Sequence, residues 1–171
     1  MASYHLGLLA DYNKEANRKM DAVIKTLSGA EWDKTFPGYF KSIHELCSHI
    51  YVCDYAWLVR YKGLRDFACL DQQFLSKNYR FDETIFSGRD EYLAMRPELD
   101  DKIIAFVNEL GPEDPGKQLT YTDSGGVTRT RKMEGLVLHL LNHETHHRAM
   151  ISLYLEMMGK ENDFNSVSSI L

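Results

Sequence analysis

The fold of this chain is decided by residues 136–159, LVLHLLNHETHHRAMISLYLEMMG. The stretch contains no proline, and its one glycine is the last residue. Its apolar side chains recur in steps of three and four, the spacing that puts them on one face of an α-helix. We therefore predict a helix over about 131–158, the longest in the chain, which ends at Gly159.

Two earlier segments show the same helical spacing. The first covers about 6–27 and is followed by Gly29, which we expect to be its C-cap. The second covers about 43–61. Ser42 precedes it as a candidate N-cap, and Glu45 three residues further on completes the pattern of a capping box. Both segments therefore carry the start or stop signals of amphipathic helices.

A third segment, about 89–110, also has helical spacing and contains Pro97, which starts its regular part or kinks it. The residues before it, 63–88, are rich in Phe and Tyr, so we expect them to pack across one end of the helices. Residues 119–129, LTYTDSGGVTR, alternate around a Gly-Gly turn and predict a short β-hairpin. The chain is thus predicted to be one domain, 1–171: an all-α four-helix bundle with a long crossover between helices 2 and 3 and a small β-hairpin before helix 4.

Charge and composition exclude several classes of protein. The 171 residues include 20 Lys plus Arg and 25 Asp plus Glu, and the net charge of −5 argues against nucleic-acid binding, which needs a basic face. No run approaches the about 18 apolar residues of a membrane span, and no signal peptide is apparent. Three cysteines without CxxC spacing argue against a disulfide framework. We expect a cytoplasmic protein with reduced thiols.

Four of the seven histidines fall between residues 139 and 147. Two of them, His143 and His147, lie four residues apart on an otherwise apolar stripe, so their rings point off the same face of the helix. This is the spacing with which two histidines bind one metal ion. The alternative is a pair of core histidines satisfied by hydrogen bonds. Burying charged imidazolium rings is costly, whereas a metal ion uses the neutral form.

A third metal ligand should come from another helix. On the second predicted helix, Leu46, His49, Cys53 and Trp57 form an inward-facing stripe with one histidine in it. Cys53 is either a fourth ligand, a redox thiol or an inert buried residue. His44 lies about 140° around that helix from His49, and we expect it at the surface.

The other two clustered histidines have different expected positions. His139 is about 12 Å along the helix from His147, too far for both to bind one ion together with His143. We expect it near the site, as a pocket wall or a core residue, and we expect His146 to be peripheral. The string from His143 to His147 also satisfies H-E-x-x-H, the zinc-peptidase motif with Glu144 as general base. Such peptidases commonly take a third ligand downstream, where this chain has no further histidine.

Three segments together resemble the DinB-like (damage-inducible, YfiT-like) metalloenzyme family. They are HLLNHETHHR at 139–148, SIHELCSHI at 42–50 and YNKEAN at 12–17. The resemblance spans nearly the whole chain and implies a four-helix bundle that binds one divalent metal ion through His49, His143 and His147. Where that family commonly has Gly-Gln after the His-Arg pair, this chain has Ala-Met at 149–150.

The resemblance implies a metal-dependent transferase that acts on a small molecule with a low-molecular-weight thiol. A metal-dependent hydrolase and a non-catalytic metal-binding stress-response module remain as alternatives. Glu144 either orients a metal-bound water or is a solvent-facing or salt-bridged residue, and Arg148 is expected to pair with a carboxylate of the protein or of a substrate. Imidazole ligands suit zinc, nickel, copper and iron, and of these we expect zinc or nickel first and iron next. Members of the family also commonly form homodimers, which we expect here without nucleic-acid or membrane partners.

Overall fold

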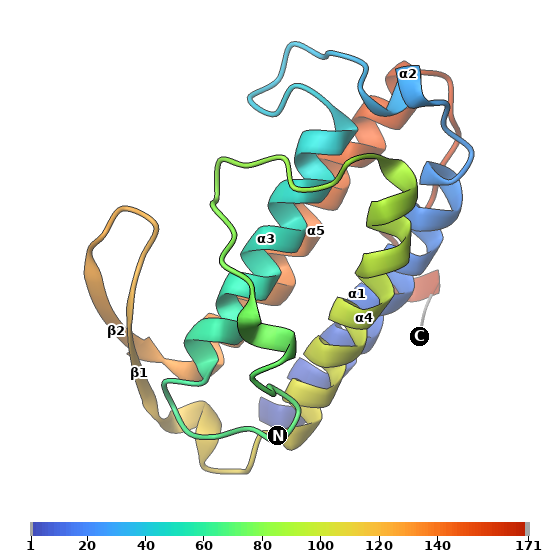
Figure 1. Cartoon of the computed structure of the whole chain (residues 1–171). Helices are drawn as coiled ribbons and strands as arrows, with labels where there is room; N and C mark the ends of the chain where they lie inside the picture. The colour runs from blue at the N-terminus through green and yellow to red at the C-terminus, as the bar shows by residue number, and fades with distance from the viewer. Residues whose placement is uncertain (1, 170–171) are drawn as a thin grey trace.

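Four long helices run side by side in the computed structural model, which describes residues 2–169 (Figure 1). The predicted four-helix bundle is therefore confirmed, and the helix ends lie within a few residues of those expected from the apolar spacing. A short fifth helix, α2, adds one turn at one end of the bundle. The helices are α1 (Ala2–Ile24), α2 (Gly29–Trp32), α3 (Ile43–Tyr61), α4 (Arg89–Glu109) and α5 (Met133–Met157).

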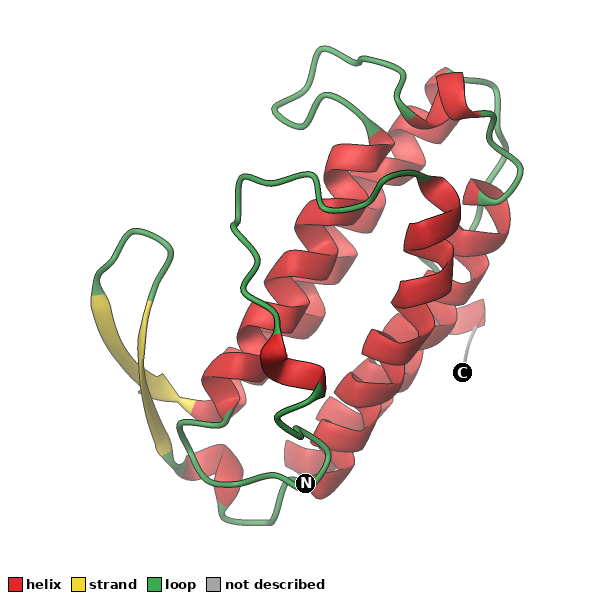
Figure 2. Ribbon diagram, viewed as in Figure 1, coloured by secondary structure: helices red, strands yellow, loops and turns green. Residues whose placement is uncertain are grey.

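The order of helix directions is unusual for a bundle with short loops. The helices α1 and α5 run one way, whereas α3 and α4 both run the other way (Figure 1). Because α3 and α4 are consecutive and parallel, the chain between them has to return along the whole length of the bundle. The expectation that residues 63–88 pack across one end is therefore wrong. They climb along the side of the bundle, mostly as loop with a single 3-10 turn at Phe74–Ser76 (Figure 2).

The crossover is attached to the bundle at several points. Arg65 donates from Nε to Asp114 Oδ2 at 3.0 Å, and the Glu109 carboxylate accepts backbone N–H bonds from Ala68 and Cys69 at 2.7 and 3.0 Å. Lys102 adds a 2.7 Å ion pair with Asp71, and aromatic and aliphatic side chains of the segment also pack against the bundle. Those buried in the core are Phe67, Leu70 and Phe86.

Gly29 does not cap α1, as was expected from the sequence. It opens α2, where Ser28 is the N-cap and forms a capping box with Glu31. Ser42 is confirmed as the N-cap of α3, because its side chain accepts from the Glu45 backbone N–H at 3.1 Å. The long helix α5 ends as predicted at Gly159, whose φ of 72° is a conformation that favours glycine.

The β-hairpin is confirmed and leads directly into α5. Strands β1 (Gln118–Thr122) and β2 (Thr128–Lys132) pair antiparallel, with Gln118 opposite Lys132 and Thr122 opposite Thr128. The turn between them contains Gly126 at a φ of 80°. Most of the hairpin is exposed. It fixes the start of α5, because Met133, the first residue of α5, donates its N–H to the carbonyl of Lys117, the residue before β1, at 2.9 Å.

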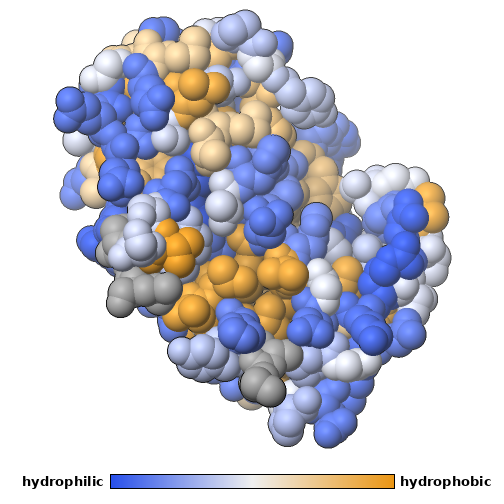
Figure 3. Space-filling view, turned by 180° about the vertical axis from the view of Figure 1, so that it is seen from behind, coloured by the Kyte–Doolittle hydropathy of each residue, from blue (hydrophilic) through white to orange (hydrophobic). Residues whose placement is uncertain are grey.

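No helix within residues 2–169 has the length and apolar character needed to cross a membrane. Hydrophobic side chains nevertheless come to the surface on the side opposite the crossover, where α1 and α5 face the viewer (Figure 3). On α5 the large exposed ones are Leu138, Leu153 and Met157, each about half exposed. This helix is therefore apolar on its buried side and in part on its exposed side as well.

Candidate metal centre

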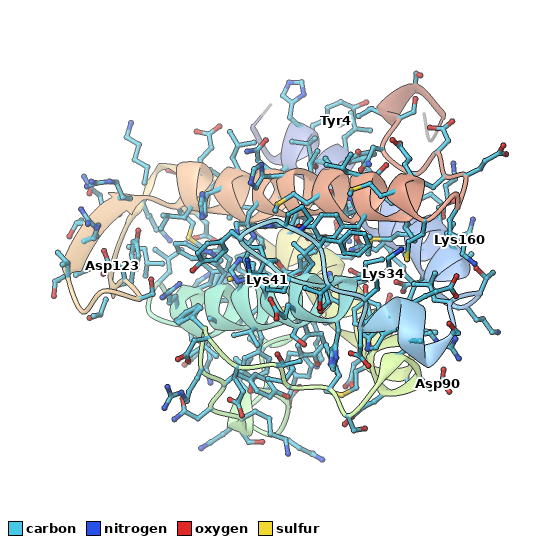
Figure 4. The ribbon with its side chains drawn as sticks, turned by 90° about the horizontal axis from the view of Figure 1, so that it is seen from above. Tyr4, Lys34, Lys41, Asp90, Asp123 and Lys160 are labelled. Atoms are coloured by element: carbon cyan, nitrogen blue, oxygen red, sulfur yellow. The ribbon has the colours of Figure 1, made fainter. Side chains whose placement is uncertain are left out.

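The helices α3 and α5 lie alongside each other, with side chains crowded between them (Figure 4). This contact brings together His49 and Cys53 from α3 and His143 and His147 from α5. Within each helix the two residues are one turn apart, so each helix presents two donors to the same space. The sequence pattern that singled out His49, His143 and His147 therefore corresponds to one cluster in the structure.

The three histidine rings meet through the same kind of atom. His143 Nε2 lies 3.0 Å from His147 Nε2 and 3.3 Å from His49 Nε2, and the ring centroids of His49 and His147 are 4.6 Å apart. Metal–nitrogen bonds of about 2.0–2.1 Å in a tetrahedral site place two nitrogens about 3.3 Å apart. The two separations from His143 Nε2 are close to that value, and the His49 and His147 rings lie beside each other, so the three histidines are candidate ligands of a single ion.

Burial keeps these rings neutral, which is the form that binds a metal ion. His147 is only 6% exposed, and His49 and His143 are half-buried. Burial, with the neighbouring rings as a further cause, lowers the pKa of His143 to about 4 and that of His147 to about 3, and burial also lowers the pKa of His49. All three are therefore unprotonated at neutral pH, and an ion would not compete with protons for them.

A loop residue that the sequence did not single out covers one side of the cluster. The Phe40 ring, just before α3, lies 4.5 Å from the His49 ring and 5.4 Å from the His147 ring, centroid to centroid. Its backbone carbonyl accepts a 2.8 Å hydrogen bond from the Tyr154 hydroxyl on α5. Tyr154 in turn stacks on Phe36 at 4.1 Å. The loop before α3 is thus held against the end of α5, with an aromatic ring over the histidines.

Gly38 allows this close approach, and Gly38→Ala should disturb it. A Cβ at that position would overlap the Tyr154 hydroxyl and lie 3.2 Å from the Phe40 carbonyl oxygen. We expect the variant to lose roughly 1–3 kcal/mol of unfolding free energy, the usual cost of overpacking, and to expose the histidines to solvent. Urea unfolding measures the loss of unfolding free energy, and the rate at which diethyl pyrocarbonate modifies the histidines measures their exposure.

Gly7→Ala is the matched control for that experiment, because nothing lies within 4 Å of a Cβ at Gly7 in the middle of α1. There the added methyl group should stabilise the helix by roughly 0.5–1 kcal/mol. If the two alanine variants unfolded at the same urea concentration, the Gly38 contact would not hold the loop.

Two cavities open beside the cluster. One, of about 480 Å³, is lined by Phe40 and His49 together with Phe81 from the crossover. The other, of about 500 Å³, includes Trp57, His139 and the cationic side chains Arg131 and Lys132. The first reaches a candidate ligand directly, and the second reaches the site through His139, whose ring centroid is 5.8 Å from that of His143.

Three of the four other histidines lie in three different places. His139 is in the wall of the second cavity, where its ring packs on Trp57 at 5.3 Å. His146 is exposed, as expected for a peripheral residue. The expectation that His44 lies at the surface is wrong, because it stacks on the buried Trp32 at 5.0 Å and contacts Asp33 Oδ1 at 2.8 Å through Nδ1. Through these contacts His44 joins α3 to the region of α2, away from the candidate ligands.

Glu144 and Arg148 lie on a different face of α5 from the candidate ligand histidines, the face that contacts α1. Both are fully buried, and Arg148 Nη1 lies 3.2 Å from Glu144 Oε2. Their other partners are on α1: Asn17 Nδ2 donates to Glu144 Oε2 at 2.7 Å, and Arg148 Nη2 donates to Asn13 Oδ1 at 2.5 Å. Within residues 2–169 no hydrogen bond joins Glu144 or Arg148 to a ligand histidine. The arrangement of a zinc peptidase, with the glutamate beside the ion, is therefore not formed.

A third buried cation extends this polar cluster through the bundle. Arg96 on α4 donates from Nη1 to Asp54 Oδ2 at 2.6 Å and from Nε to Asp100 Oδ1 at 2.9 Å, and it lies 3.5 Å from Glu144 Oε2. Burial raises the pKa of Asp54 and of Glu144, and the nearby arginines act against that shift. We call Asp54, Arg96, Asp100, Glu144 and Arg148 the buried ionic network. It joins α3, α4 and α5, and through the two asparagines also α1.

Comparisons with known proteins agree with this architecture. The model of the DinB family matches residues 1–165. Protein DinB of Bacillus subtilis (strain 168) is 29% identical over 154 residues, which cover 88% of this chain and 84% of that protein. The DinB-like protein YjoA of Bacillus subtilis superposes with a TM-score of 0.63 at 16% identity, over 93% of this chain and 97% of that one.

A second solved structure, YfiT from Bacillus subtilis, has a TM-score of 0.64 at 15% identity and covers 90% of this chain and 87% of its own. It is described as a probable metal-dependent hydrolase with an unusual four-helix bundle topology. Identities this low establish the shared fold alone. The parallel arrangement of α3 and α4 is consistent with that description of the bundle.

Proposed function

Because this chain belongs to the DinB family, we propose that it is an enzyme that acts on a small molecule with the help of one divalent metal ion. The observation that supports this most directly is the position of His143 Nε2, which lies 3.0 Å from His147 Nε2 and 3.3 Å from His49 Nε2, with all three rings neutral. Three such ligands leave room for water or substrate, as in catalytic rather than structural sites. The bound ion would lower the pKa of a water or thiol at that position.

The chain's own residues shape the space around the nucleophile. Phe40 shields the histidines on one side, and the cavity beside it offers the Phe81 ring as a flat apolar wall for a small organic substrate. For Glu144 the sequence left a role at a metal-bound water and a salt bridge as alternatives, and for Arg148 it left a carboxylate of a substrate or of the protein. Their burial and their partners support the second alternative in each case, in which they position α5, and with it His143 and His147, against α1.

Two reactions fit this site and differ in the nucleophile. Hydrolysis, with water as the nucleophile, is supported by the description of YfiT as a probable metal-dependent hydrolase. Transfer to a low-molecular-weight thiol is supported by the second cavity, whose Arg131 and Lys132 would attract an anionic co-substrate beside His139. Two cavities on two sides of one cluster suit a reaction with two substrates. All-imidazole ligation suits zinc or nickel best and iron next.

Activity of the metal-loaded protein tests this proposal and separates the two reactions. We expect turnover that a chelator abolishes and that added zinc or nickel restores. Consumption of an epoxide or alkyl halide only when an anionic thiol is present would indicate the transferase, and cleavage of an ester, amide or phosphate without thiol would indicate the hydrolase. For the transferase, Arg131→Ala should raise KM for the anionic thiol without changing KM for the electrophile.

Turnover that survives complete metal removal would contradict the proposal. Stoichiometric metal binding without turnover in either assay would instead identify a non-catalytic metal-binding module. Lys25→Ala, a substitution of an exposed lysine just beyond α1, is the matched control for Arg131→Ala and should leave both KM values unchanged.

A further inference from the structure

The histidine cluster contains a fourth side chain of the type that binds metals. Cys53 lies one turn after His49 on α3, and its Sγ is 3.6 Å from His49 Nε2 and 3.8 Å from His49 Nδ1. One donor atom each from His49, Cys53 and His143 can be chosen so that all three lie within 4.8 Å of one another. The sulfur therefore lies in the same space as ligand nitrogens of His49 and His143. His143 Nε2 in turn lies 3.0 Å from His147 Nε2.

The geometry of this sulfur matches that of a ligand. In a tetrahedral site with a metal–sulfur bond of about 2.3 Å and a metal–nitrogen bond of about 2.0–2.1 Å, sulfur and nitrogen are about 3.6 Å apart. The separation between Cys53 Sγ and His49 Nε2 is 3.6 Å. We propose that Cys53 is a fourth ligand of the ion held by His49, His143 and His147. This inference rests on the metal centre of the proposed function.

The other two cysteines do not share this position. Cys47, two turns of helix closer to the start of α3, is fully buried beside Asp21 and Tyr92. Cys69 lies in the crossover, where its backbone N–H donates to Glu109 at 3.0 Å. A thiol that only filled core volume would need no histidine beside it, whereas Cys53 lies at the cluster and is 8% exposed.

A thiolate ligand would change the site in two ways. Ligation breaks the S–H bond of Cys53 and forms a sulfur–metal bond, and the proton passes to solvent, with no oxidant or reductant involved. The thiolate cancels one of the two positive charges, and it favours thiophilic ions such as zinc, cobalt and cadmium over manganese. It also completes a set of four protein ligands, so substrate would have to displace Cys53 or enter as a fifth ligand.

Cobalt(II) titration of the whole protein tests the assignment through a signal that does not depend on turnover. Wild-type protein should bind one cobalt ion and show a sulfur-to-cobalt charge-transfer absorption in the near ultraviolet. Cys53→Ser should still bind one ion through its three histidines but lose that absorption. Its affinity for zinc should fall roughly tenfold or more, while that for manganese changes less. Cys69→Ser, the matched control, should keep the absorption and both affinities.

The outcomes separate this inference from the proposed function. If wild-type protein binds cobalt without the sulfur absorption, Cys53 is not a ligand, and the three-histidine centre stands. If it binds no cobalt, zinc or nickel at all, the centre and this inference both fail. Thermal unfolding of metal-free Cys53→Ser and Cys53→Ala shows whether the fold is kept. Loss of the absorption from both folded variants supports the assignment, and its persistence in either one overturns it.

Discussion

His143→Ala should abolish stoichiometric binding of a divalent metal ion. His143 Nε2 is the atom that lies within 3.3 Å of both other ligand nitrogens, those of His49 and His147. Its removal leaves two imidazoles on two different helices, with the centre of the site empty. We expect the affinity for zinc to fall by more than the 10–100-fold typical of a residue that only supports a ligand. Calorimetric titration of metal-free protein, and elemental analysis after dialysis, measure this directly.

His146→Ala is the matched control on the same helix. His146 is exposed and differs from the ligands only in the direction of its side chain, so its removal should leave the metal content unchanged. The His143→Ala variant must also stay folded without metal, which circular dichroism checks. If it kept one ion per chain at wild-type affinity, the assignment of the ligands would be wrong, however well the distances fit.

The sequence could single out the candidate ligands because each interrupts an apolar stripe. His143 and His147 stand where the spacing of α5 requires core residues, and His49 does the same on α3. The resemblance to the DinB-like family then indicated that histidines of both helices bind the same ion. The histidine spacing within one helix follows from its pitch, but the pairing of α3 with α5 depends on long-range packing that no local pattern specifies.

Members of the buried ionic network also interrupt apolar stripes in the sequence. Arg96 falls on the apolar stripe of α4, three residues before Leu99 and seven before Ile103. Glu144 and Arg148 fall on a second apolar stripe of α5 that continues to Ile151. A charged residue in such a stripe indicates a buried ion pair as readily as it indicates catalysis. Only the partners on other helices decide between the two.

The path of the crossover and the position of the loop before α3 could not be predicted from the sequence, for a different reason. The aromatic content of residues 63–88 indicated that the segment packs against the helices, and Phe67 and Phe86 are buried, but it did not indicate the path of the chain. That path follows from the parallel directions of α3 and α4, a property of the whole topology. Phe40 was missed because nothing in its local sequence shows that it lies over the histidines. Its position depends on the contact of Gly38 with Tyr154, 116 residues later in the chain.

The largest effect on stability should come from Arg96→Met. Arg96 is fully buried, and its guanidinium pairs with Asp54 and Asp100 and lies 3.5 Å from Glu144. Methionine keeps much of the aliphatic volume but leaves buried carboxylates without their cation. Removing one partner of a buried pair costs about 3–5 kcal/mol, a large part of the about 5–15 kcal/mol that stabilises a typical domain. Urea unfolding at pH 7 measures the loss.

The pH dependence of that loss identifies its cause. Without Arg96, the pKa of Asp54, which burial already raises, should rise further, because the guanidinium no longer favours the charged form. When the pKa of a carboxyl group is higher in the folded than in the unfolded protein, the free energy of unfolding falls as the pH rises and recovers as the pH falls. The difference in the free energy of unfolding between Arg96→Met and wild type should therefore be smaller at pH 5 than at pH 7. A difference that stayed constant would point to lost packing rather than to uncompensated charge.

Two comparisons complete the test. Arg18→Met removes an exposed arginine that pairs with Glu15 at 2.6 Å, and it should leave the free energy of unfolding nearly unchanged, because water screens such pairs. The folded fraction of Arg96→Met should still bind one metal ion per chain, since Arg96 contacts none of the ligand histidines. Loss of metal binding from folded protein would instead show that the buried ionic network holds α3 and α5 at the separation that the three imidazoles require.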